Sequence, residues 1–145
     1  MPYFNAESKD LIIALLIVAT FFFCFTLQKM MGRIPKENLS ISNGYVWLFL
    51  IPIVGLIFKW IMLPFAIPKA LKKTFPNNQD AINITNTLFK LGLVQVIFTS
   101  LALIFPMRPY SLIATTISLL VWIVYWILIV LFKNKYLKTR ITATT

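Results

Sequence analysis

The chain has 145 residues, of which 59% are hydrophobic and only 12% are charged, and its mean hydropathy is +0.84. This composition excludes an ordinary soluble domain and predicts a single all-α integral membrane domain over residues 1–145. The formal net charge is +10. The basic residues lie at the ends of apolar runs, which favours contact with the lipid bilayer and its anionic lipids over nucleic-acid binding.

Four apolar segments are long enough to cross a bilayer, since a membrane-spanning helix needs about 20 residues. The first lacks the small-residue cleavage site of a signal peptide, so we expect it to be retained. The third and fourth are separated only by residues 106–109, which predicts that they form an antiparallel hairpin. The predicted transmembrane helices cover residues 11–28, 45–67, 86–105 and 110–132.

The second span differs from the other three because it contains prolines and a charge. It includes Pro52 and carries Lys59 inside its apolar run. Pro64 and Pro68 interrupt regular helical hydrogen bonding, so residues 64–75 are expected to bend onto the membrane surface as an interfacial segment.

Pro52, Gly55 and Lys59 are three and four residues apart, so they share one face of a helix. An intramembrane charge is costly and usually faces protein or water, which makes Lys59 a candidate contact for a substrate, a lipid phosphate or an ion. The alternative is that Lys59 only snorkels to the cytoplasmic headgroups while Pro52 kinks the span. Counting from Tyr45 places Lys59 nearer the basic end of the span, which favours snorkelling.

Small and polar residues also line one face of the third and fourth spans. Such stripes are typical of helix packing, with hydroxyl and amide groups hydrogen-bonding between helices, and a pore lining is the alternative. The stripe is Gly92, Gln95, Thr99 and Ala102 on the third span, and Ser111, Thr115, Ser118, Trp122 and Tyr125 on the fourth. The candidate polar and packing site therefore comprises Pro52, Gly55, Lys59, Gly92, Gln95 and Thr99.

The sequence contains few residues of the types used in catalysis or metal binding. The sequence has no histidine and one cysteine, Cys24, so it offers no imidazole ligand and no dithiol pair. Its four acidic residues lie in tails or loops, and no glycine-rich phosphate loop is present. We therefore expect no catalytic residue, no metal site, no cofactor and no enzymatic activity.

Residues 45–75 combine the spacing Trp47-x4-Pro52 with an apolar run, Pro64 and a basic helix. This stretch resembles small uncharacterised bacterial membrane proteins that share the pattern W-x(n)-P-x-x-N/G-x-x-x-P. The resemblance implies a multi-pass protein of the bacterial inner membrane and no particular activity. Small multidrug exporters have a similar size, but they carry a glutamate in the first span that this chain lacks.

The distribution of basic residues predicts an orientation. With four crossings, both termini and the loop after the second span share one side, which holds eight lysine or arginine residues against four on the other. The positive-inside rule then places both termini in the cytoplasm. The expected contacts with lipid headgroups are Lys69, Lys72, Lys73, Lys133, Lys135, Lys138 and Arg140. The bases expected on the opposite side are Lys29, Arg33, Lys36 and Arg108.

These observations favour a non-enzymatic membrane protein, an accessory or assembly subunit of a larger membrane complex. Its partners would be other membrane proteins or further copies of itself. The alternative is a small transporter, channel or lipid-handling protein that uses Lys59 and the polar stripe of the third span. A lipid-modifying enzyme is a third hypothesis, disfavoured because the spans contain no acidic residue and no histidine.

Overall fold

The computed structural model describes residues 6–107 and 109–138, and this part of the chain is helical with no β-strand. Its elements in chain order are α1 (Ala6–Met31), the 3₁₀ helices η1 (Lys36–Asn38) and η2 (Asn43–Leu50), α2 (Pro52–Ile61), the π-helical turn η3 (Met62–Ala66), α3 (Ile67–Thr74), α4 (Gln79–Ile104), α5 (Tyr110–Phe132) and a second π-helical turn, η4 (Lys133–Leu137).

Four helical segments of the described chain are long and apolar enough to cross a membrane, which confirms the helical class and the number of apolar helices. These segments are Lys9–Met31, Pro52–Thr74, Gln79–Ile104 and Tyr110–Leu137. The third begins at Gln79 rather than at residue 86 because the Asn78 side chain caps it. That side chain accepts a hydrogen bond of 3.0 Å from the backbone amide of Ala81.

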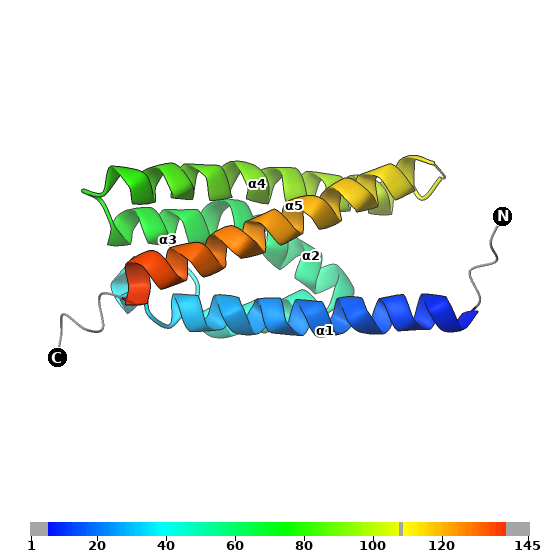
Figure 1. Cartoon of the computed structure of the whole chain (residues 1–145), viewed down its shortest axis with the longest axis horizontal. Coiled ribbons are helices and arrows are strands. Elements are labelled where there is room, and N and C mark those ends of the chain that lie inside the picture. Colours follow the sequence, from blue (N-terminus) through cyan, green and yellow to red (C-terminus); the bar gives the residue numbers. More distant parts are fainter. Residues whose placement is uncertain (1–5, 108, 139–145) are drawn as a thin grey trace.

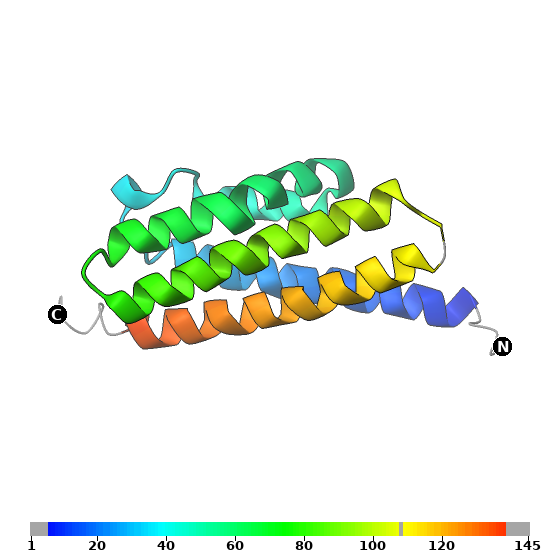
Figure 2. The same cartoon turned by 90° about the horizontal axis from the view of Figure 1, so that it is seen from above.

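The long helices form an elongated bundle in which α4 packs against both α3 and α5 (Figures 1 and 2). α1, α3 and α5 end at one end of this bundle, and α4 begins there. We call it the basic end because most of the described basic residues lie there. α1 starts at the opposite end, and its side chains from Leu11 to Val18 are exposed along the whole stretch. The first half of α1 therefore has no packing partner within the described chain.

The second apolar helix begins at Pro52, so the predicted start at residue 45 is wrong. The helical region is disfavoured for a residue that precedes a proline, and Ile51 is extended with φ −89° and ψ 119°. Pro52 then occupies the first turn of α2, where its missing N–H is not needed. Residues 43–50 instead form η2, which packs against α1 and α2. We call residues 43–74 the inner hairpin.

The prolines at 64 and 68 do not end the second helix. The backbone N–H of Ile67 donates to the carbonyl of Met62, five residues earlier, so η3 is a single π-helical turn that absorbs Pro64. The helix then continues as α3, whose Ile67, Ala70 and Leu71 are buried. α3 packs along α4 rather than leaving the bundle, so the interfacial segment expected at residues 64–75 is not confirmed.

An aromatic cluster joins α1 to η2 and α5 in the core. The fully buried Phe23 has its ring centre 5.4 Å from that of Trp122 and 6.5 Å from that of Phe49. Trp126 and Tyr125 lie at similar distances from the same ring. Edge-to-face aromatic pairs contribute about 0.5–1.5 kcal/mol beyond their buried area. This cluster anchors the second half of α1.

Candidate functional site

Gly55 closes the inner hairpin. A Cβ atom at this position would lie 2.7 Å from the Leu48 carbonyl oxygen and 2.8 Å from that of Phe49. Only glycine therefore allows α2 to touch the backbone of η2. Pro52, on the same predicted face, is exposed at the turn of the hairpin and takes no part in this contact. Of the three residues predicted to share this helix face, the structure therefore places Gly55 and Lys59 beside η2.

Lys59 lies partly buried below η2, with its Nζ atom 5.9 Å from the centre of the Phe49 ring. Cys24 of α1 donates from its Sγ atom to the Val46 carbonyl of η2 at 3.3 Å. The described part of the chain contains no ion pair to Lys59. The ammonium group thus sits at the junction of α1, η2 and α2 without a carboxylate partner.

The count that placed Lys59 nearer the basic end assumed a helix from Tyr45, whereas α2 begins at Pro52. At about 1.5 Å per residue, Lys59 is about 10 Å from the start of α2 and about 22 Å from Thr74. Side chains on a helix also point toward its N-terminus. Lys59 is therefore directed away from the basic end, which removes the argument that it snorkels to the headgroups there.

The residues predicted on the third span meet two different neighbours. Gly92 faces the inner hairpin, where an added Cβ would lie 2.7 Å from the Leu63 carbonyl oxygen and 2.8 Å from the nitrogen of Pro64. Thr99 instead faces α5 and forms a hydrogen bond of 2.8 Å with the Ser118 hydroxyl. Gln95 lies between them, buried, and its Nε2 atom is 3.5 Å from the Thr99 hydroxyl.

Gly92, Thr99 and Ser118 of the stripe thus lie at helix contacts, whereas Thr115 is exposed and donates only to the Ser111 carbonyl of its own helix. Trp60 of α2 adds a contact of the same kind, donating to the Ser100 hydroxyl at 2.9 Å. Gln95 Oε1 is buried and has no hydrogen-bond partner among the described residues.

Tyr125 fills a role that the sequence analysis missed. In a regular helix the N–H of Ile67 would donate to the Leu63 carbonyl, but in η3 it donates to Met62. The π-helical alternative would use the N–H of residue 68, which is a proline. The Leu63 carbonyl is therefore left without a backbone donor, and the Tyr125 hydroxyl donates to it at 2.8 Å. The signal in the sequence is the pair of prolines four residues apart.

The basic residues gather at one end of the bundle, which contradicts the predicted split. The Asn38 side chain donates to the Thr74 hydroxyl at 3.3 Å, so the loop after α1 meets the end of α3. Lys133 is close enough to Lys29 and Arg33 to interact with their charges. The described bases at this end are Lys29, Arg33, Lys36, Lys69, Lys72, Lys73, Lys133, Lys135 and Lys138.

The split was wrong because both ends of the inner hairpin emerge at the basic end (Figure 1). The chain enters the bundle again through η2 instead of staying outside it. α1 consequently begins at one end of the bundle and α5 finishes at the other, whereas both ends of the chain are expected to share a side; the orientation of the chain in a membrane stays a prediction. Arg108 and Arg140, which the orientation and lipid-contact predictions also used, lie outside the described residues.

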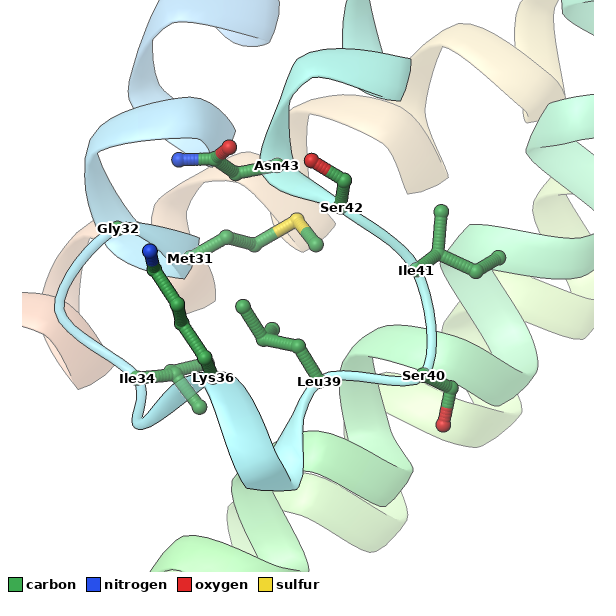
Figure 3. A pocket seen from close by; sticks show the side chains of 9 residues that line it. All are labelled: Met31, Gly32, Ile34, Lys36, Leu39, Ser40, Ile41, Ser42 and Asn43. Atoms are coloured by element: carbon green, nitrogen blue, oxygen red, sulfur yellow. The ribbon is translucent and has the colours of Figure 1, made fainter.

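Two hollows occur near this end. The loop between α1 and η2 encloses one of about 410 Å³, with Met31 and Leu39 directed into it and the Lys36 amine at its rim (Figure 3). The other is an open groove of about 380 Å³ between α3 and α4. No carboxylate lines either hollow, and the described residues contain no group of three side chains suited to bind a metal ion.

No protein-family model matches the chain, and comparison with curated proteins and solved structures finds no significant match. The resemblance proposed for residues 45–75 therefore stays a prediction. The class of protein follows from the fold itself, because four long apolar helices indicate a multi-pass membrane protein.

Proposed function

We propose that this protein is a non-enzymatic accessory or assembly subunit of a larger membrane complex. The supporting observation is the free first half of α1, where Leu11, Leu15 and Ile17 are each about 60% exposed. Elsewhere in the bundle the helices pack on one another through glycines and hydrogen-bonded polar groups. Other helices also expose apolar side chains, such as Leu120 of α5, but α1 is the least buried of the four apolar helices, and we therefore place the partner on its first half.

The alternative, a small transporter, has less support. Thr99 is hydrogen-bonded to Ser118, and the inner hairpin occupies the space beside Gly92. These stripe residues therefore line no open path. Lys59 and the unpaired Gln95 Oε1 are the features that a transport mechanism would have to use.

We further infer a membrane topology from the charge distribution. The basic end carries the nine described bases named above, whereas Lys9 lies toward the other end of α1. The positive-inside rule places the basic end in the cytoplasm, here of a bacterial inner membrane. In this topology α1, α4 and α5 cross the membrane, and the inner hairpin enters and leaves on the cytoplasmic side. η2, the irregular part of this hairpin, packs against α1 and α2, as non-helical backbone at membrane depth requires, whereas the turn at residues 50–53 is exposed.

The proposed function is tested by photocrosslinking in living cells. A photoreactive phenylalanine at Leu15 is compared with one at Leu120 of α5, because both side chains are 59% exposed. We expect a cross-linked protein of defined mass at position 15, only lipid adducts at position 120, and loss of co-purification of that protein in Leu15→Trp. Equal adducts at both positions, or lipid adducts alone, would reject the proposal.

A further inference from the structure

The open groove between α3 and α4 has an ordered lining along its length. Phe65, Lys69 and Lys72 are four and three residues apart, so they lie in one row on the second apolar helix. α4 contributes Asn86 and Phe89, one turn apart, on the facing wall. Pro64 and Pro68, which are buried, also line the groove.

The lining changes from charged to apolar along the bundle axis. Lys72 and Lys69 are exposed at the basic end, whereas Phe65 lies about 10 Å deeper than Lys72 at about 1.5 Å per residue. Phe65 and Phe89 meet there, with ring centres 5.8 Å apart, and both rings remain partly exposed at 51% and 37%. The groove is therefore cationic at the basic end of the bundle and aromatic farther from that end.

No acidic side chain of the described chain lines the groove beside the two lysines. Asp80, in the first turn of α4, is not among the residues that line the groove. The Thr85 hydroxyl is already bonded to the Ala81 carbonyl at 2.8 Å, which leaves the Asn86 amide as the polar group beside the lysines. This combination suits an anionic group rather than a neutral one.

We propose that this groove binds one anionic phospholipid, with its phosphate at Lys69 and Lys72 and one acyl chain against Phe65 and Phe89. A free phosphate ion would use the lysines but would gain nothing from the two rings. A neutral lipid would use the rings but would lack the charge-assisted hydrogen bonds. The proposal is independent of the accessory-subunit function, since it concerns a different face of the molecule from the first half of α1.

The test is a binding titration of the full chain in detergent, followed by native mass spectrometry. The probes are dioleoyl phosphatidylglycerol, dioleoyl phosphatidylcholine and inorganic phosphate. We expect phosphatidylglycerol to bind at least about tenfold more tightly than phosphatidylcholine. The double variant Lys69→Gln/Lys72→Gln should lose about tenfold in affinity for phosphatidylglycerol. Its matched control is Lys73→Gln/Lys138→Gln, which removes the same charge from exposed positions at the same end but outside the groove.

Phe89→Ala separates lipid from free phosphate. It should weaken binding of phosphatidylglycerol several-fold while leaving any binding of inorganic phosphate unchanged. The proposal is overturned if the control double variant loses as much affinity as the groove variant, because the bases then act as a diffuse positive surface. It is equally overturned if phosphatidylcholine binds as well as phosphatidylglycerol, or if Phe89→Ala leaves lipid binding unchanged.

Discussion

The hydrogen bond from Tyr125 to the Leu63 carbonyl gives the sharpest test of the packing described above. Tyr125→Phe removes only the hydroxyl, and the ring can stay in its fully buried position. The Leu63 carbonyl then has no donor, because Ile67 donates to Met62 and Pro68 has no N–H. A buried acceptor left without a partner costs about 1–3 kcal/mol, and hydrogen bonds in membrane proteins reach about 1.7 kcal/mol.

We therefore expect Tyr125→Phe to lower the free energy of unfolding by about 1–2 kcal/mol. The assay is reversible unfolding in mixed micelles, followed by circular dichroism. Tyr110→Phe is the control, since Tyr110 is 71% exposed and its substitution should change stability by less than about 0.5 kcal/mol.

A double-mutant cycle with Pro68→Ala tests the cause. Alanine at position 68 supplies the backbone N–H that the π-helical turn lacks, so the Leu63 carbonyl gains a second possible donor. The cost of Tyr125→Phe should then fall to less than half of its value in the wild-type background. An unchanged cost in the Pro68→Ala background would refute the argument that the prolines leave this carbonyl dependent on Tyr125.

Two further predictions concern the inner hairpin. Gly55→Ala and Gly92→Ala should each destabilise the protein by about 1–3 kcal/mol, because the new methyl group would lie within 2.8 Å of backbone atoms, whereas Gly44→Ala, with nothing within 4 Å, should be neutral in the same unfolding assay. Lys59→Leu should raise the free energy of unfolding by about 1 kcal/mol or more, since the lysine has no carboxylate partner in the described chain and intramembrane charges are costly. A destabilised Lys59→Leu, or one that loses its bound partner, would show that the ammonium has a function at this site.

The apolar helices could be predicted from sequence because each carries a long run without acidic residues. The start of the second one could not be placed by hydropathy, since residues 45–51 are as apolar as the helix that follows. Pro52 indicates where this helix starts, because proline is favoured in the first turn of a helix. The predicted orientation depends on the same point, because the count of bases on each side depends on how many times the chain enters the membrane.

The candidate site was predicted in its residue types and not in its contacts. Gly55 and Gly92 stand out in the sequence as small residues in apolar helices, and both do allow a close backbone approach. Sequence spacing could not reveal that Gly55 contacts η2 while Gly92 contacts Leu63. η2 and Leu63 both belong to the inner hairpin, which the hydropathy pattern predicts as one straight span. Hydrogen bonds such as that from Tyr125 to Leu63 join residues 62 positions apart, beyond the reach of any local pattern.

That separation also has a consequence for how the protein is made. The ribosome must add 62 residues after Leu63 before Tyr125 exists, which takes about 3–12 s at typical rates of synthesis. During this interval Trp60 lacks Ser100 and the Leu63 carbonyl lacks its donor, so the inner hairpin reaches the membrane with polar groups still unpaired. It must wait beside water or the insertion machinery until α4 and α5 arrive. A nascent chain arrested before α5 should accordingly hold this hairpin loosely, and its final docking is a late step of biogenesis.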